Sequence, residues 1–199
     1  MVVPGEVTIV SATDAPWADV EQVFGTRGDP SRCWCQFFKM SNAGWDTAKS
    51  AECKAEFQAQ VRASATSPGV IAYLDGEAVG WCAVEPRVNY SRLARTKIVT
   101  DGSTEPLDDA SVWAVTCFVV RVGYRRRGIA AALLLGAIEQ ARRHGARVLE
   151  GYPVDVAERA KTSAAELYHG SLSLFLGAGF EVASRPSPGR PVTRLQLAT

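Results

Sequence analysis

The segment from Val112 to Ala130 constrains the fold more than any other part of the chain. Its first part, Val112–Val120, is apolar and rich in β-branched residues, which is typical of a central strand buried on both faces. A basic turn, 121–127, follows, and a helix rich in small residues is predicted from Gly128 to His144. Because the first N–H groups of a helix lack internal partners and lie at the positive end of its dipole, this order of elements predicts a site for an anion.

Three arginines and two small residues give this turn its character. Arg125, Arg126 and Arg127 add positive charge, and Gly128 and Ala130 let a pyrophosphate approach the backbone without a side chain in the way. The alternative is an exposed basic turn without a ligand, which the spacing of the small residues disfavours. An RNA-binding role is also disfavoured, because the basic cluster is short and has no aromatic stacking platform beside it.

The rest of the chain is predicted to complete an α/β fold in which helices flank one mixed sheet. Two strands, Val70–Leu74 and Ala78–Val84, are joined by Asp75-Gly76 and form a hairpin. Further strands are predicted at Val7–Val10, Arg147–Tyr152, Gly179–Ala183 and Val192–Leu197. Helices are predicted at Ala18–Phe24, at Thr47–Ala63, with Asp46 as its N-cap, and at Ala164–Leu176. Long connections are predicted at Gly25–Trp45 and Arg87–Ala110. Within the second connection, Lys97–Thr100 is expected to be a short ordered piece.

Composition and charge exclude several classes of protein. The chain has 199 residues, of which 47% are hydrophobic and 22% charged, and this predicts one globular domain over residues 1–199. A net charge of +1 lacks the field of a dedicated nucleic-acid binder. The longest apolar runs fall far short of the ~18 residues of a membrane span. Five cysteines, an odd number with no secretion signal ahead of them, predict a reducing and therefore cytoplasmic location.

Two motifs resemble those of the GNAT superfamily of acyl-CoA-dependent N-acetyltransferases. Arg125-x-x-Gly128-x-Ala130 is similar to the family's Arg/Gln-x-x-Gly-x-Gly/Ala signature, and the segment Phe175–Phe180 resembles its closing helix-to-strand motif, which ends in Gly-Phe. The predicted order of elements matches the family as well. The resemblance implies a single GNAT-like domain with a mixed sheet of about six to seven strands and helices on both faces.

The resemblance also implies that acetyl-CoA is the cosubstrate. It would lie in a cleft where the strands Val112–Val120 and Arg147–Tyr152 splay apart. Main-chain groups of Phe118, Val119 and Val120 would pair with its pantetheine arm. The N–H groups of the turn would hold its pyrophosphate, and these belong to Arg125, Arg126, Arg127, Gly128, Ile129 and Ala130.

The catalytic groups of the family do not carry over to this chain. Deprotonation of an amine with a pKa near 10.4 costs about 4.6 kcal/mol at pH 7. Departure of CoA as an unprotonated thiolate costs only about 2 kcal/mol at pH 7, because the thiol has a pKa near 8.5. A general base therefore matters more than a general acid. Many family members use a Glu on the fourth strand as base and a Tyr on the last helix as acid, but these places hold Ala114 and Phe175, which cannot transfer a proton.

Other side chains are candidates for the two roles. Tyr168 and Tyr152 are candidate acids, and Glu85 and Glu150, both on predicted strands, are candidate bases that act through water. The alternative for each carboxylate is a solvated residue at a strand end.

The segment 33–38, Cys-Trp-Cys-Gln-Phe-Phe, follows the first helix and predicts an aromatic wall beside the acceptor. No metal site is expected, because Cys53 is the one further candidate ligand and the spacing is not that of a zinc knuckle. Cys33 and Cys35 of this segment are interpreted as packing residues or reduced thiols. Trp34 and Trp45 are either core residues or acceptor contacts, and Trp81 and Trp113 are expected in the core.

These features predict an N-acetyltransferase that moves an acetyl group from acetyl-CoA to a primary amine of a small molecule or protein, by direct attack in a ternary complex. The alternative is a catalytically weak or inactive module of the same fold that binds or senses acyl-CoA, which Ala114 and Phe175 favour. The expected partner is a small-molecule or peptide amine, with no nucleic acid and no membrane. The chain would act as a monomer or homodimer.

Overall fold

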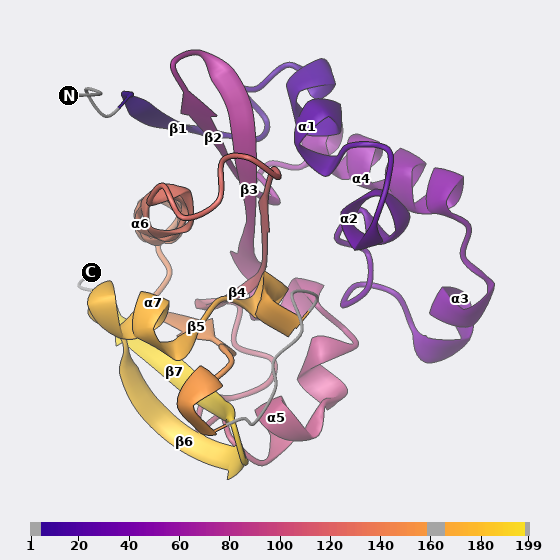
Figure 1. The fold of residues 1–199 in the computed structure, drawn as a ribbon. Helices are drawn as coiled ribbons and strands as arrows, with labels where there is room; N and C mark the ends of the chain where they lie inside the picture. Colours follow the sequence, from indigo (N-terminus) through magenta and orange to yellow (C-terminus); the bar gives the residue numbers. More distant parts are fainter. Residues whose placement is uncertain (1–4, 159–165, 198–199) are drawn as a thin grey trace.

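The computed structural model describes residues 5–158 and 166–197. Its strands form one seven-stranded sheet in the order β1-β2-β3-β4-β5-β7-β6 (Figure 1). They are β1 (Val7–Ser11), β2 (Gly69–Leu74), β3 (Glu77–Pro86), β4 (Val112–Val120), β5 (Val148–Gly151), β6 (Glu181–Ser187) and β7 (Arg190–Gln196). The β4–β5 pair is parallel and the other pairs are antiparallel. The predicted mixed sheet is therefore confirmed.

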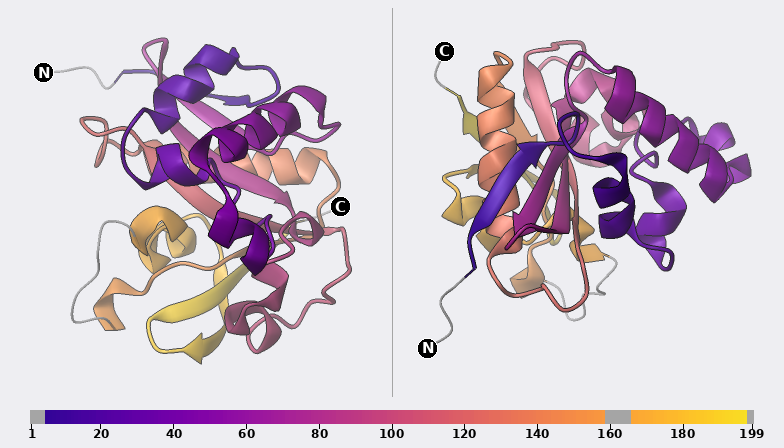
Figure 2. Two further views of the ribbon diagram at one scale, coloured as in Figure 1. Left: turned by 90° about the vertical axis from the view of Figure 1, so that its right-hand side faces the viewer. Right: turned by 90° about the horizontal axis from the view of Figure 1, so that it is seen from above.

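Helices cover both faces of this sheet. Helix α6 (Ile129–Arg143) lies on one face, and α1 (Trp17–Phe24), α2 (Asp29–Cys33) and α4 (Ser50–Ala63) lie on the other (Figures 1 and 2). The remaining helices are α3 (Asn42–Thr47), α5 (Lys97–Thr100) and α7 (Leu172–Gly177), with the 3-10 helices η1 (Arg87–Asn89), η2 (Leu93–Arg95), η3 (Val156–Glu158) and η4 (Glu166–His169). This arrangement confirms the predicted α/β class.

Two different cores hold the helices in place. Beneath α6, Leu133, Leu134 and Ala137 are fully buried, because apolar residues recur at helical spacing along that face of the helix. The opposite core is aromatic: Trp34 stacks on Phe24 with ring centroids 4.9 Å apart. Trp34 is thus a core residue, and the predicted burial of Trp81 and Trp113 is confirmed.

Strand β4 is irregular at its centre. Ala83 of β3 pairs with Cys117, but the next residue, Val84, pairs with Val115, so Thr116 is an extra residue that forms a β-bulge. The pairing of β4 with β5 also ends at Val115. The second half of β4 therefore extends beyond β5 while it stays paired with β3, as the predicted splay requires.

The predictions for the segment 25–63 are partly wrong. The expected connection Gly25–Trp45 contains α2 and the start of α3, and the helix expected at Thr47–Ala63 begins at Ser50. Lys49 is extended, and its N–H donates to the Glu52 side chain at 3.0 Å. Asp46 lies inside α3 and is no cap, because Glu52 stabilises the start of α4 instead.

The helix predicted at Ala164–Leu176 is also interrupted. Residues 164–165 lie outside the part of the chain that the structure describes. The remainder forms η4 and α7, which are separated by Gly170 with a φ of +79°. Ser171 then caps α7 by accepting the Leu174 N–H at 3.3 Å. A left-handed glycine and a new cap end one helix and start another although the apolar pattern continues.

Candidate active site

The free part of β4 lies where the pantetheine arm was predicted. Val119 and Val120 pair with Trp81 and Gly80 of β3 on one side, and on the other side the strand has passed the last residue that pairs with β5. Phe118 lies on the same stretch, with its side chain buried. Main-chain groups of these residues that face away from β3 are therefore placed to bind an extended ligand, as an added strand would be bound.

The turn after β4 opens toward solvent at Gly128. This residue has a φ of +79° and precedes the first turn of α6, and a Cβ added to it would meet nothing within 4 Å. The first hydrogen bond inside the helix runs from the Ala132 N–H to the Gly128 carbonyl at 3.0 Å. The N–H groups of Ile129, Ala130 and the next residue therefore have no partner within the helix. Open space in front of free N–H groups fits a pyrophosphate.

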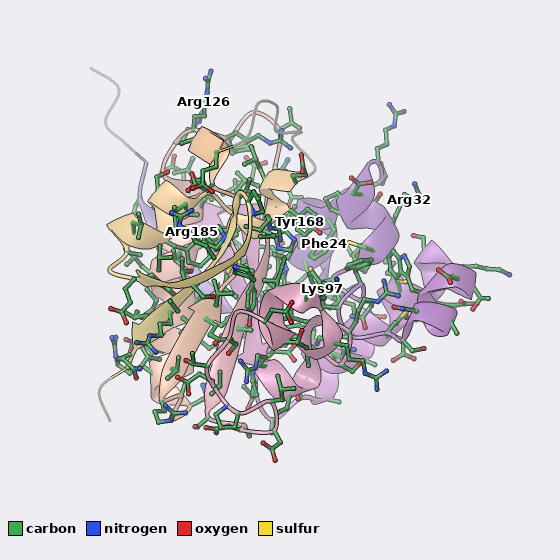
Figure 3. The ribbon with its side chains drawn as sticks, turned by 90° about the horizontal axis from the view of Figure 1, so that it is seen from below. Phe24, Arg32, Lys97, Arg126, Tyr168 and Arg185 are labelled. Atoms are coloured by element: carbon green, nitrogen blue, oxygen red, sulfur yellow. The ribbon has the colours of Figure 1, made fainter. Side chains whose placement is uncertain are left out.

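The three arginines of the turn point in different directions. The Arg125 Nε donates to the Val120 carbonyl at 3.3 Å, and the Arg127 guanidinium lies over the Tyr124 ring, 5.5 Å from its centroid. Arg126 points away from the body of the protein (Figure 3). The arginine side chains thus contribute charge around the turn, whereas the cradle itself is built from backbone.

Glu85 lies beside Ala114, the position at which many GNAT-like sequences carry the catalytic Glu. In the β3–β4 register Glu85 is opposite Ala114, and opposite residues of an antiparallel pair share a face of the sheet. The Glu85 side chain is buried, forms an ion pair with Lys39, and accepts a hydrogen bond from the Asn89 Nδ2 at 3.0 Å. Lys39 also donates to the Gln60 Oε1 at 2.8 Å. A carboxylate is therefore held firmly next to the Ala114 methyl group.

Glu150 and Tyr152 bind each other and a buried arginine. Glu150 accepts hydrogen bonds from the Arg87 Nη1 and the Tyr152 hydroxyl, both at 2.7 Å, and from the Ser103 hydroxyl at 2.5 Å. Arg87 is fully buried and also donates to the Pro106 carbonyl. Burial, and then the charge of Glu150, raise the pKa of Tyr152 well above its usual value. These contacts anchor the segment 87–110 on β5. They also occupy the Glu150 carboxylate and the Tyr152 hydroxyl, the groups that would transfer a proton.

Tyr168 packs against the cluster of side chains that contains Ala114, in the interior of the view in Figure 3. It is half-buried, and burial raises its pKa to about 12. Tyr168 therefore packs on the cluster that contains Ala114, the residue opposite Glu85, although the three residues come from distant parts of the chain. Tyr152 belongs to that cluster as well, but its hydroxyl is bound to Glu150.

His169 joins η4 to the bulge of β4. Its Nδ1 lies 3.1 Å from the Thr116 carbonyl, and since a carbonyl only accepts, Nδ1 is assigned the hydrogen. Burial, and then the positive charge of Arg190, lower the pKa of His169 to about 3, so the ring is neutral at pH 7. Its ring also lies 4.1 Å from that of Tyr168, centroid to centroid. His169 therefore fixes the position of Tyr168 relative to β4.

The cysteines of the segment 33–38 face the protein interior. Burial, and then Cys35, raise the pKa of the Cys33 thiol to about 12, and the Trp81 Nε1 donates to the Cys35 Sγ at 3.1 Å. All five cysteines are free thiols. Within residues 5–158 and 166–197, no group of three or more His, Cys, Asp or Glu side chains is arranged to hold a metal ion.

Sequence reasoning missed Lys39, Asn89 and the roles of Thr116 and His169. A β-bulge leaves no mark in an apolar run, and a polar residue such as Asn89 after a strand end is ordinary. Lys39 lies directly after Phe37 and Phe38, and this lone charge behind aromatic residues was the one available signal.

Comparison with known families identifies the fold. The model of the acetyltransferase (GNAT) family matches residues 34–169, which is more than half of the chain. The chain belongs to the GNAT acetyltransferase family. The predicted resemblance is thus confirmed, and the signature turn of this GNAT protein lies within the matched part.

Solved structures of GNAT proteins share this fold across nearly the whole chain. An N-acetyltransferase from Staphylococcus aureus Mu50 has a TM-score of 0.55 and 16% sequence identity, and the match covers 97% of this GNAT protein and 99% of that chain. A GCN5-related N-acetyltransferase from Kribbella flavida has a TM-score of 0.53 and 17% identity, and the match covers 96% of this GNAT protein and 98% of that chain. The protein yncA from Salmonella typhimurium, solved with its cofactor acetyl-CoA, has a TM-score of 0.52 and 16% identity, and the match covers 96% of this GNAT protein and 94% of that chain.

At these identities the likeness concerns the fold. No curated protein sequence matches this GNAT protein significantly. Among the residues that the structure describes, no helix is long and apolar enough to cross a membrane.

Proposed function

We propose that this protein transfers an acetyl group from acetyl-CoA to a primary amine of a small molecule or peptide. The observation that carries the proposal is the free half of β4, which begins at the Thr116 bulge and leads into the open turn at Gly128. Acetyl-CoA would supply the activated acetyl group. In this proposal the whole chain acts as one domain, and the five free thiols support a cytoplasmic location.

The chain's own groups would hold the two ends of acetyl-CoA separately. Main-chain groups of Phe118, Val119 and Val120 would bind the pantetheine arm, and the backbone of residues 125–130 would bind the pyrophosphate. Because most of these contacts are backbone contacts, binding depends on the shape of the turn more than on any one arginine. The exposed Arg125, Arg126 and Arg127 would add attraction for the negative phosphates.

Glu85 is the proposed general base. An acceptor ammonium must lose a proton before it attacks, at a cost of about 4.6 kcal/mol at pH 7 for a lysine-like amine. Lys39 and Asn89 hold the Glu85 carboxylate on the face of the sheet that carries Ala114. Glu85 would take the proton through a water molecule, which is the role that a Glu at position 114 has in many relatives.

Tyr168 is the proposed hydrogen-bond donor to the departing sulfur. With a pKa of about 12, its hydroxyl keeps its proton at pH 7. Full transfer to a thiolate whose acid has a pKa near 8.5 is uphill by about 4.8 kcal/mol. Tyr168 would therefore stabilise the thiolate by a hydrogen bond, and solvent would supply the proton. Tyr152 is proposed to orient Glu150.

The alternative function is an acyl-CoA-binding module with little or no catalysis. Two observations favour it: position 114 carries only a methyl group, and Phe175 is fully buried against Gly151 and Phe118. Both functions predict that CoA binds. They differ in whether acetyl-CoA is consumed.

Release of free thiol from acetyl-CoA, measured with a panel of primary amines, tests the proposal. Amine-dependent thiol release together with an acetylated amine detected by mass spectrometry supports the transferase. Saturable binding of acetyl-CoA without release by any amine in the panel supports the binding module. Absence of both binding and release would refute the assignment of the site.

A further inference from the structure

A cavity of about 330 Å³ lies on the protein surface between α3 and η2. Phe37 and Ser41 line it on one side, and Ser91, Arg92 and Arg95 line it on the other. Its lining holds two arginines, several hydroxyl groups and an aromatic ring, and no Asp or Glu of the described residues lines it. A site of this composition attracts an anion.

Arg92 is held rigidly without a negative partner. Its Nε donates to the Met40 carbonyl at 3.3 Å and its Nη2 to the Ser41 carbonyl at 3.1 Å. Its guanidinium lies 4.5 Å from the Phe37 ring centroid and 5.8 Å from that of Trp45. All of these partners are neutral, so the charge of Arg92 is not compensated by a carboxylate of the described residues, and among those residues the structure gives its Nη1 no hydrogen-bond partner.

Arg95 adds a second charge of the same kind. It is exposed, and the structure gives it no ion pair with any described residue. By contrast, Arg87, in the same segment, is paired with Glu150. A guanidinium group offers a planar pair of donors that matches the two oxygens of a carboxylate. One fixed guanidinium and one flexible one at a single cavity thus suit a carboxylate ligand.

The cavity is connected to the proposed reaction centre by the segment 37–39. Phe37 forms part of the cavity, and Lys39, two residues later, contacts Glu85. The Phe37 ring lies 5.0 Å from the Phe38 ring, which lies 5.7 Å from the ring of His169. Two ring-to-ring steps therefore separate the cavity from the residue that binds the bulge carbonyl.

We infer that this cavity is a subsite for the acceptor, and that it binds a carboxylate group carried by the amine substrate several bonds away from the reacting nitrogen. The inference rests on the proposed function, because that function places the amine beside Glu85. It narrows the acceptor class to extended amines with a distal carboxylate, such as an ω-amino acid or a short peptide with an acidic residue.

Matched pairs of acceptors test the subsite. The first pair is 8-aminooctanoate, whose extended chain is about as long as the two ring steps, and its neutral primary amide. The second pair is Gly-Gly-Asp and Gly-Gly-Asn, both amidated at the C-terminus so that only the first carries a carboxylate, and it distinguishes a peptide source from a small molecule. With saturating acetyl-CoA, thiol release should give a kcat/KM about tenfold or more higher for the carboxylate member of at least one pair.

Substitutions then assign this preference to the cavity. Arg95→Gln, at an exposed residue, should lower kcat/KM for the carboxylate far more than for the amide, and Arg92→Gln, with folding checked by circular dichroism, should do the same. Arg143→Gln, at an arginine whose side chain is 73% exposed on α6, is the matched control for net charge and should keep the preference. Equal rates within both pairs, or equal loss in Arg143→Gln, would overturn the inference.

Binding of a product tests the subsite without catalysis. N-acetyl-8-aminooctanoate should bind the CoA-loaded parent about tenfold more tightly than it binds CoA-loaded Arg95→Gln, as measured by NMR titration. If no amine is acetylated but this difference is found, the proposed function fails and the subsite stands. If amines are acetylated but the product binds both proteins equally, the subsite fails and the proposed function stands.

Discussion

Substitution of Gly128 by valine separates the anion site from the stability of the fold. Gly128 has a φ of +79°, and a Cβ placed on it meets open space. The Cβ of a valine would therefore clash with nothing in the free protein, and its methyl groups are expected to occupy the space in front of the N–H groups of Ile129 and Ala130. The backbone cost of a side chain in the left-handed region is about 1–2 kcal/mol, so the variant should fold.

The loss of CoA affinity should exceed this strain. A hydrogen bond from an N–H group to a charged phosphate contributes about 1.5–3 kcal/mol, and displacement of the pyrophosphate from one or two such groups costs about 2–4 kcal/mol. This corresponds to a rise in Kd of about 30-fold to 1,000-fold. Isothermal titration calorimetry with CoA measures this change, and denaturant unfolding in the absence of CoA measures the strain.

Gly145→Val provides the matched control. Gly145 follows the other end of the same helix with a φ of +74°, and a Cβ added there also meets nothing within 4 Å. Both variants should lose similar unfolding free energy, and only Gly128→Val should lose CoA affinity. The reasoning is refuted if folded Gly128→Val binds CoA within threefold of the parent, or if Gly145→Val weakens binding as much.

Three further outcomes are expected. Glu85→Gln should lower kcat/KM about 100-fold or more at pH 7. This loss in kcat/KM should become smaller as the pH rises, because the amine then deprotonates without a base. A loss that stays constant from pH 7 to 9 would contradict a base role. Tyr168→Phe should lower kcat about tenfold, whereas Tyr152→Phe should act mainly on the free energy of unfolding, by about 1–3 kcal/mol; the reverse pattern would contradict these assignments. His169 has a pKa of about 3 in the folded protein and about 6.5 in the unfolded chain, so only the unfolded chain takes up this proton as the pH falls below 6.5. The free energy of unfolding should therefore fall by up to about 1.4 kcal/mol per pH unit. Urea titrations of His169→Gln should lack this pH dependence, and equal slopes in parent and variant would contradict the low pKa.

Local chemistry in the sequence was enough to predict the elements that carry the proposed cofactor site. Strand β4 has the predicted bounds, Val112–Val120, and α6 begins one residue after the predicted Gly128. An apolar run, a basic turn and small residues at a helix start each act over a few residues, so they can be recognised without knowledge of the rest of the chain. The same applies to the family signature at Arg125, Gly128 and Ala130.

The tertiary structure decided the surroundings of the proposed reaction centre, because those contacts join residues far apart in the chain. Glu85 lies opposite Ala114 only through the register of β3 and β4, and the Thr116 bulge sets that register. Glu150 is a candidate base in the sequence, but Arg87 and Tyr152 engage it once the chain folds. Sequence patterns report periodicity and local conformation, whereas the partner of a buried charge depends on which strands pair and where they shift. The proposal of Glu85 as the base therefore rests on its place opposite Ala114, which only the folded structure gives.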